Sequence, residues 1–212
     1  GHSIPETYGG AGLTTEELAL VNIEVSQVAT AFRARFGGNT GIASESLVVD
    51  GTADQKSRWL PELASGRLTG CFALTEPQAG SDLSMVRSRA EPQADGTYKV
   101  FGTKIYITYG EHDMAKNIVH LVLARVQGAP EGVKGISLFV VPKFHINADG
   151  SLGERNGIYC GGLEHKMGIH GNATCQMVLD GAVGTMVGQP NKGLAAMFVM
   201  MNAARVGVGM QS

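Results

Sequence analysis

Apolar residues change their spacing twice along this chain, and these two changes limit the folds that it can adopt. Before Thr69 they recur every three or four positions, as on one face of a helix. From Thr69 they form short β-branched and aromatic runs with a two-residue period, and helical spacing returns near Pro190. The pattern predicts an α+β fold: a helical segment, then an antiparallel β-barrel or sandwich-like middle domain, then a truncated helix.

Three helices are expected in the first part of the chain, over residues 14–31, 39–50 and 54–64. Thr14 or Thr15 can cap the first of them, because a threonine hydroxyl accepts a hydrogen bond from a free N–H at a helix start. Gly51 and Gly66 can end the second and third, since glycine readily adopts the left-handed conformation that often follows a helix. We therefore expect residues 1–68 to form a helical part.

Five strands are expected in the middle of the chain, over residues 86–90, 98–108, 118–125, 136–141 and 174–179. Asp95-Gly96 and Asp149-Gly150 are typical of tight turns between antiparallel strands. Helices do not alternate with these strands, and no Gly-x-Gly-x-x-Gly motif follows a strand, so a Rossmann domain is not expected. The predicted β-domain covers residues 69–187, and the final helical part covers residues 188–212.

Composition limits the classes of partner. The formal net charge is −2 and the isoelectric point is near 6.3, so the chain offers no basic field for nucleic acid or an anionic membrane. No apolar run is long enough to span a bilayer, and no cleavable signal is visible. An odd, sparse set of cysteines favours free thiols in a reducing compartment over a disulfide framework, and we expect a cytoplasmic protein.

Two segments offer the pieces of a ligand site. Residues 71–82, with the sequence CFALTEPQAGSD, begin as an apolar strand and turn at Thr75 into a loop with little side-chain bulk. Such a loop exposes backbone N–H groups and hydroxyls to a polar ligand. Residues 104–108, KIYIT, form a second strand that again ends in threonine. Two strand ends that each carry a hydroxyl and an aromatic ring suit a planar heterocycle lying between them.

Five collinear segments resemble the acyl-CoA dehydrogenase family, namely residues 4–12, 51–66, 71–82, 106–108 and 193–205. The resemblance implies an FAD-dependent enzyme. It also implies that the chain is a fragment, which holds the end of the N-terminal helical domain, the whole middle β-domain and the first helix of the C-terminal helical domain. In the family the flavin is held partly by a neighbouring subunit, so a homo-oligomer is expected for the full-length protein.

The resemblance assigns a set of flavin-binding residues: Phe72, Ala73, Leu74, Thr75, Gly80, Ser81, Tyr106, Ile107 and Thr108. Residues that match Thr75 and Ser81 contact the flavin ring and pyrophosphate, and the residue that matches Thr108 hydrogen-bonds near the reactive nitrogen. The aromatic residue that matches Tyr106 packs on the ring. The alternative is that these hydroxyls only close turns and strand ends, as most such residues do.

The resemblance places Ser81, Asn202 and Arg205 along the pantetheine arm of an acyl-CoA. Asparagine at 202 departs from the usual aspartate, which keeps hydrogen bonding and loses a charge. Arg205 could instead cap its helix or satisfy polar groups in a core. No catalytic residue is assigned, because the family's catalytic glutamate is expected beyond Ser212. The chain alone is therefore expected to be inactive and to hold FAD weakly or not at all.

Four possible metal ligands follow one another at intervals of five residues: Cys160, His165, His170 and Cys175. This spacing matches no common zinc motif, and on strands an odd spacing alternates between the two faces, so no metal site is expected. Residues 161–169 instead resemble an enlarged acyl-CoA dehydrogenase subfamily, the one that includes 3-methylmercaptopropionyl-CoA dehydrogenases. An insertion at residues 143–157 fits that enlargement.

The resemblance implies α,β-desaturation of an acyl-CoA thioester, with hydride transfer to FAD and electron-transfer flavoprotein as the electron acceptor. Two other readings stay open. A flavin oxidase or monooxygenase of the same superfamily would pass electrons to oxygen, and a non-catalytic scaffold would keep the β-domain without flavin. Retention of Thr75, Ser81 and Thr108 argues against the scaffold.

Overall fold

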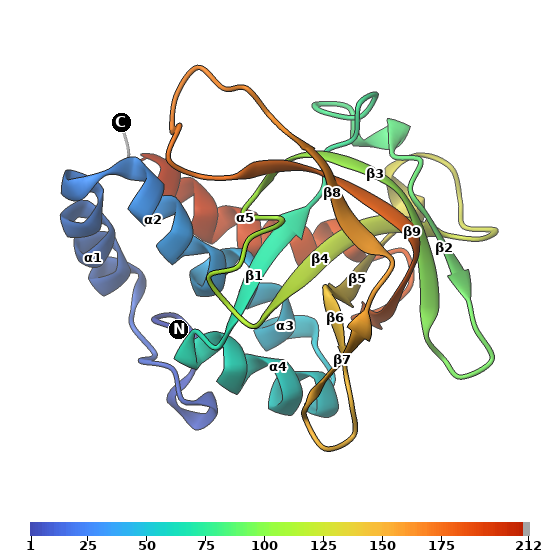
Figure 1. The fold of residues 1–212 in the computed structure, drawn as a ribbon, viewed down its shortest axis with the longest axis horizontal. Coiled ribbons are helices and arrows are strands. Elements are labelled where there is room, and N and C mark those ends of the chain that lie inside the picture. Colours follow the sequence, from blue (N-terminus) through green and yellow to red (C-terminus); the bar gives the residue numbers. More distant parts are fainter. Residues whose placement is uncertain (210–212) are drawn as a thin grey trace.

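A computed structural model describes residues 1–209 and has the expected α+β architecture (Figure 1). Five α-helices and nine strands occur in the described residues, with helices before and after the strands in the sequence. Helices α1 to α4 gather on one side of the molecule, and α5 runs along the sheet (Figure 1). Residues 210–212, which fall in the predicted final helical part, lie outside the described residues.

The helical part is more broken than the sequence predicts. Its elements are α1 (Thr15–Val28), α2 (Thr30–Gly37), the π-helical turn η2 (Gly38–Ile42), α3 (Glu45–Asp50) and α4 (Ala53–Ser65). The helix predicted over residues 14–31 stops at Val28, because Ala29 has an extended backbone. Thr14 and Thr52 cap α1 and α4, and each hydroxyl accepts from a backbone N–H three residues on.

The sheet strands are β1 (Leu68–Ala73), β2 (Arg89–Pro92), β3 (Tyr98–Thr108), β4 (Asn117–Val126), β5 (Ile136–Pro142), β8 (Ile158–Leu163) and β9 (Thr174–Val187). β4, β2, β3, β9 and β5 pair in a closed ring, with β1 added to β4 and β8 added to β9. Both β1 and β2 run parallel to β4, while the other pairs are antiparallel. The prediction of a wholly antiparallel domain was therefore wrong in these two pairs: the sheet is mixed. No α-helix of the described residues joins the strands of the ring.

The insertion at residues 143–157 forms a hairpin, β6 (Phe144–Ile146) and β7 (Leu152–Arg155), which stands apart as a two-stranded sheet. These short strands, and β8, were not predicted. Apart from the buried Ile158, their residues are partly buried or exposed, so these segments do not show the apolar pattern that marks a strand in the sequence. The predicted turn at Asp149-Gly150 does lie at the tip of this hairpin.

Two hydrophobic cores share β4. Val119, Leu121 and Leu123 point to a core that also holds residues of α3, α4 and α5, while Ile118 and Val122 point into the core inside the ring. Because successive side chains of a strand alternate between its faces, a strand buried on both sides must be apolar at nearly every position. β4 meets this requirement over most of its length.

The final helix, α5 (Gly193–Gly209), packs Ala196, Met197 and Met200 into the core between sheet and helices. Its other face is exposed, with Phe198 and Val208 about half accessible to solvent. No helix within residues 1–209 has both the length and the hydrophobicity that a membrane crossing requires.

Gly70 is the point where β1 meets the helical part most closely, and its replacement by alanine is expected to destabilise the fold. A Cβ at this position would lie 1.9 Å from the Cβ of the buried Ala43. We expect Gly70→Ala to lower the free energy of unfolding by about 1–3 kcal/mol, as overpacking of a core does.

Urea denaturation measures this effect. Gly168→Ala is the matched control, since nothing lies within 4 Å of a Cβ there, and it should change stability by less than about 0.5 kcal/mol. Adding Ala43→Gly to Gly70→Ala should restore part of the lost stability. If the double variant were no more stable than Gly70→Ala, the clash would not be the cause.

Candidate functional site

A buried ion pair joins the two segments that the sequence singled out. The Lys104 ammonium lies 2.7 Å from a Glu76 carboxylate oxygen, and the two side chains are 0% and 3% exposed. Lys104 also donates to the carbonyl oxygens of Leu74 and Leu123. Glu76 accepts from the backbone N–H groups of Arg87 and Ser88. The pair thus connects the end of β1, the loop after it, β3 and β4.

Burial and the partner's charge shift the pKa of each group in opposite directions. Burial prevails for Lys104, while charge and hydrogen bonds prevail for Glu76. Burial lowers the pKa of Lys104 to about 8, although the Glu76 carboxylate works in the opposite direction. Burial also acts to raise the pKa of Glu76. The Lys104 charge and the hydrogen bonds from Lys104, Ser88 and Arg87 together outweigh that effect, so the pKa of Glu76 lies below its usual value. Both groups are therefore charged at neutral pH.

A bulge in β3 presents Tyr106 to solvent. The pairing of β3 with β9 is irregular between Lys104 and Ile107, and Tyr106 has a φ of 59° there. Left-handed backbone is unfavourable for an aromatic residue, and such strain is concentrated at functional sites. Tyr106 is 58% exposed, a large fraction for an aromatic residue that stands between half-buried Ile105 and buried Ile107. The adjacent Ile105 N–H donates to the Thr75 carbonyl oxygen at 2.9 Å, which holds the two motifs together.

Three of the predicted flavin-binding residues, Phe72, Tyr106 and Thr108, line one cavity of about 170 Å³. Its remaining lining comes from the helical part, from α5, and from further residues of β1 and of the segment just after β3. These lining residues are Ala34, Arg35, Gly38, Ile42, Thr69, Gly70, Cys71, Tyr109, Met200, Met201 and Ala204. The cavity is therefore enclosed by the β-domain on one side and by helices on the other, and its lining is mostly apolar.

The other predicted flavin-binding residues do not line this cavity. Thr75 is half-buried, and Gly80 and Ser81 are exposed on the loop after β1. Reciprocal backbone hydrogen bonds between Glu76 and Ala79 hold that loop in shape. Ala73, Leu74 and Ile107 complete the predicted set. Ala73 and Ile107 are buried in the core inside the ring. Those two can offer a ligand only backbone atoms.

The predicted pantetheine-binding residues of α5 lie at the surface. Asn202 and Arg205 are both exposed, and an Arg205 Nη1 donates to the Asn202 Oδ1 at 3.2 Å. The guanidinium also lies over the Phe198 ring, 5.9 Å from its centre. Neither residue lines the 170 Å³ cavity. Within residues 1–209, the contacts of the Arg205 guanidinium are with two side chains of its own helix, Asn202 and Phe198.

Sequence reasoning missed the helical wall of the cavity. Arg35 contributes the one charged side chain among the described lining residues, and it donates to the Thr69 hydroxyl at 3.1 Å. The contribution of Met200 and Met201 to this wall was not predicted. A cation on a short helix that otherwise faces apolar neighbours was the available signal for Arg35.

The evenly spaced Cys160, His165, His170 and Cys175 do not converge. Cys175 is buried in the core inside the ring, whereas His165 and His170 are exposed on the loop between β8 and β9. Within residues 1–209, no group of three or more His, Cys, Asp or Glu side chains is arranged to hold a metal ion.

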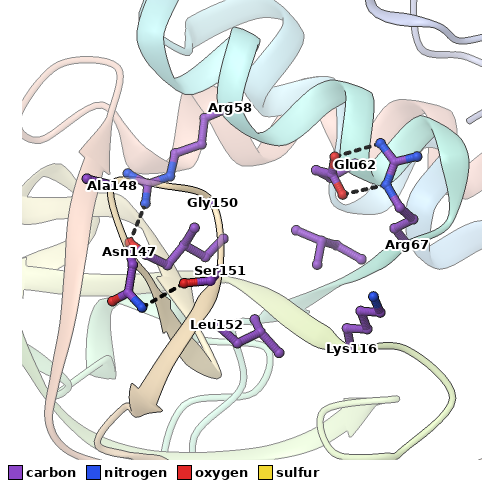
Figure 2. Close-up of a pocket in the computed structure, with 11 residues that line it drawn as sticks. Arg58, Glu62, Arg67, Lys116, Asn147, Ala148, Gly150, Ser151 and Leu152 are labelled. Atoms are coloured by element: carbon purple, nitrogen blue, oxygen red, sulfur yellow. Dashed lines mark hydrogen bonds and ion pairs between the residues drawn. The ribbon is translucent and has the colours of Figure 1, made fainter.

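A larger cavity, of about 900 Å³, lies on another part of the molecule, between α4 and the β6–β7 hairpin (Figure 2). It contains none of the predicted site residues. Its polar side chains largely pair with one another: Arg67 binds Glu62, and Arg58 donates to the Ile146 carbonyl oxygen. The Arg58 contact attaches the hairpin to α4, whereas the Arg67–Glu62 pair is local to the end of α4. We place the candidate site in the 170 Å³ cavity, where the two motifs meet.

Comparison with known proteins agrees with the geometry. Residues 71–182 match the family model described as acyl-CoA dehydrogenase, middle domain, and residues 1–67 match acyl-CoA dehydrogenase, N-terminal domain. The chain belongs to the acyl-CoA dehydrogenase family. Its curated relatives include the 3-methylmercaptopropionyl-CoA dehydrogenase of Ruegeria pomeroyi, which is 47% identical over 99% of this chain and 35% of the relative.

Solved structures of acyl-CoA dehydrogenases share the fold. The acyl-CoA dehydrogenase complexed with FAD from Bacillus anthracis matches with a TM-score of 0.83 and 31% identity, over 99% of this chain and 33% of that one. A structure described as electron transferring flavoprotein of Acidaminococcus fermentans matches with a TM-score of 0.84 and 29% identity, over 100% of this chain and 52% of that one. The chain thus spans about a third of the length of the Ruegeria relative and of the Bacillus structure.

Removal of one partner from the Lys104–Glu76 pair is expected to destabilise this acyl-CoA dehydrogenase chain strongly. Glu76→Gln or Lys104→Met should each lower the free energy of unfolding by about 3–5 kcal/mol, because each leaves a buried charge without its partner. The double variant should lose less than the sum of the two by at least about 1 kcal/mol, since neither charge remains. Urea denaturation of the four proteins measures the cycle.

The exposed pair Arg89–Glu91 is the control, and Glu91→Gln should change stability by less than about 1 kcal/mol. Strict additivity of Glu76→Gln and Lys104→Met would contradict the coupling that the distance implies.

The same pair predicts an acid dependence. The pKa of Glu76 is below its usual 4.5 in the folded chain, so the unfolded chain binds more protons between the two values. The stability that Glu76 confers is complete above the unfolded pKa and is lost as pH falls through the folded one. Between about pH 6 and 3, the difference in unfolding free energy between the unmodified chain and Glu76→Gln should therefore shrink. A constant difference over this range would refute the shift.

Proposed function

We propose that this chain is the flavin platform of an FAD-dependent acyl-CoA dehydrogenase that desaturates an acyl-CoA thioester between its α and β carbons. One observation carries the proposal: Phe72, Tyr106 and Thr108, from two separate strands, line one largely apolar cavity between the β-domain and the helices. The likeness to an acyl-CoA dehydrogenase complexed with FAD supports it. In this proposal residues 1–68, 69–187 and 188–212 are the end of one helical domain, the middle domain and the start of another.

The residues present fit a flavin. An isoalloxazine ring is flat and largely apolar with polar edges, and Tyr106 offers an exposed ring held outward by a backbone bulge. The Thr108 hydroxyl makes no side-chain hydrogen bond to another of residues 1–209, so its hydrogen-bonding capacity is free for a ligand. The loop from Thr75 to Ser81 is fixed by the Glu76–Ala79 backbone pair and leaves Gly80 and Ser81 exposed. These groups would hold the ring at Thr75, Tyr106 and Thr108, and the pyrophosphate near Ser81.

Bound FAD would supply acceptance of the hydride from the substrate's β carbon. The chain's own residues would orient the ring and keep water from the reacting carbons, because the cavity lining is mostly apolar. Removal of the α proton needs a carboxylate above the α carbon. Among the described residues, no aspartate or glutamate lines this cavity. We therefore propose that the base comes from a part of the intact protein other than residues 1–212.

The proposal also covers partners. The substrate would be an acyl-CoA whose pantetheine arm passes Ser81, Asn202 and Arg205, and the Asn202–Arg205 pair at the surface is consistent with a polar contact there. Electron-transfer flavoprotein is the proposed electron acceptor, and a homo-oligomer in the cytoplasm is the proposed form of the intact protein. The identity to the Ruegeria protein favours a thioester related to 3-methylmercaptopropionyl-CoA, and the β6–β7 insertion suits the enlarged subfamily.

The experiment on the intact protein is a reaction with a series of acyl-CoAs, followed by bleaching of the flavin absorbance without oxygen. Reduction of the flavin and formation of an enoyl-CoA would support the dehydrogenase. Rapid reoxidation by oxygen with release of peroxide or an oxygenated product would favour the oxidase or monooxygenase reading. A purified protein that takes up no FAD would favour the scaffold.

Thr108→Val is expected to weaken the flavin site while leaving the fold intact. It removes one hydrogen-bonding group from the cavity. The free energy of FAD binding should weaken by about 0.5–1.5 kcal/mol, or the flavin potential should shift by the equivalent amount. FAD affinity, absorbance spectrum and potential of the intact protein measure the effect. The control is Thr103→Val, an exposed threonine on the same strand that does not line the cavity. Unchanged affinity, spectrum and potential for Thr108→Val would contradict the placement of the ring.

A further inference from the structure

A second cavity, of about 80 Å³, lies behind the candidate site, enclosed by α1, α2, the turn η2 and the last turns of α5. Its lining includes two charged side chains, Arg33 and Glu45, together with polar Ser3, Thr15 and Asn22. The candidate site's cavity is mostly apolar, so this second cavity differs from it in chemistry. A polar enclosure inside a helical layer calls for a polar occupant.

Arg33 is the unusual group in this cavity. Arg33 is only 7% exposed, and its Nε has no hydrogen-bond partner within residues 1–209. None of the ion pairs formed within residues 1–209 includes Arg33. Burial lowers its pKa. A buried guanidinium without an anion or a full set of acceptors is costly, so its retention inside the helical layer indicates a partner that arrives with a ligand.

The neighbouring helix leaves room for this guanidinium. A Cβ on Gly207 of α5 would lie 2.0 Å from an Arg33 Nη2, so any larger residue there would displace the arginine. The arginine is thus packed against a glycine that accommodates it, and its orientation into the cavity is set by α5.

The second cavity adjoins the candidate site. Ile42 and Ala204 line both cavities, so these two side chains form the boundary between them. Ile42 ends the π-helical turn η2, and such turns are frequent where a helix contributes to a functional site. An acyl chain that starts at Tyr106 and runs past Ile42 would therefore reach Arg33.

We propose that Arg33 binds an oxygen acceptor at the far end of the substrate's acyl chain. This inference rests on the proposed function, because it needs an acyl-CoA in the adjoining cavity. Glu45 lines the same cavity as Arg33, and a second carboxylate beside it would be repelled. The arrangement thus favours a neutral acceptor that can also donate, such as a hydroxyl, over a carboxylate. Arg33 in this role is a determinant of specificity and touches no reacting carbon.

The test uses the intact protein loaded with FAD and three acyl-CoAs of equal chain length that end in a methyl, a hydroxyl and a carboxylate group. Dissociation constants and kcat/KM are measured for each. The unmodified protein should favour the hydroxyl-ended chain over the methyl-ended chain by about 10- to 100-fold, the range of a hydrogen bond to a charged group. Arg33→Met should abolish or reverse this preference while leaving FAD affinity unchanged. Glu45→Gln should improve the carboxylate-ended chain most.

Arg58→Met is the matched control, since this exposed arginine lies on α4 and lines neither cavity, and it should leave the preference unchanged. A second measurement separates ligand binding from a structural role: without substrate, the melting temperature of Arg33→Met should not fall, because within residues 1–209 the Arg33 Nε has no hydrogen-bond partner and Arg33 forms no ion pair. A marked fall, or an equal preference for all three chains before and after the substitution, would overturn the inference alone. If none of the three thioesters bound, the proposed function would fail as well.

Discussion

The Lys104–Glu76 ion pair is the interaction on which the candidate site depends. The ammonium reaches carbonyl oxygens at the end of β1 and in β4, while the carboxylate takes the backbone N–H groups of Arg87 and Ser88. Both charges are buried, so each needs all of these partners. Because the pair fixes the chain just before Tyr106 and just after Thr75, the spacing of the two motifs follows from electrostatics in the core. The hydrogen bond from the Ile105 N–H to the Thr75 carbonyl oxygen joins the same two motifs.

Much of the fold could be predicted because its signals are local. The turns at Asp95-Gly96 and Asp149-Gly150 and the caps at Thr14 and Thr52 need only their immediate neighbours. The parallel pairing of β1 with β4 could not be predicted, since register between distant strands depends on contacts that no local pattern records. The break at Ala29 was missed for a related reason: the apolar spacing continues from α1 into α2 while the helix axis changes.

The residues of the candidate site also fall into two groups, those that the sequence identified and those that it did not. Phe72, Tyr106 and Thr108 were named from their motifs, and the structure places them around one cavity. Arg35, Met200 and Ala204 were not named from the sequence. They lie on helices, and the way these helices face β1 and β3 depends on tertiary packing, which no local pattern records. Arg33 shows the limit most clearly. In the sequence it is one of two arginines on a short helix, and what distinguishes it is burial together with an Nε that has no hydrogen-bond partner within residues 1–209.

The closed ring of β4, β2, β3, β9 and β5 has a consequence for how this protein can change over evolutionary time. A ring whose strands are all paired resists rearrangement, so Tyr106 and Thr108 stand on a strand, β3, that is paired on both sides, while Phe72 lies on β1, which is joined to the ring through β4. The opposite wall consists of short helical segments joined by Ala29 and by the turn η2, where an insertion or a substitution disturbs few strand pairings. Substitutions can therefore accumulate on the helical side of the cavity with less effect on strand pairing than substitutions within the ring would have.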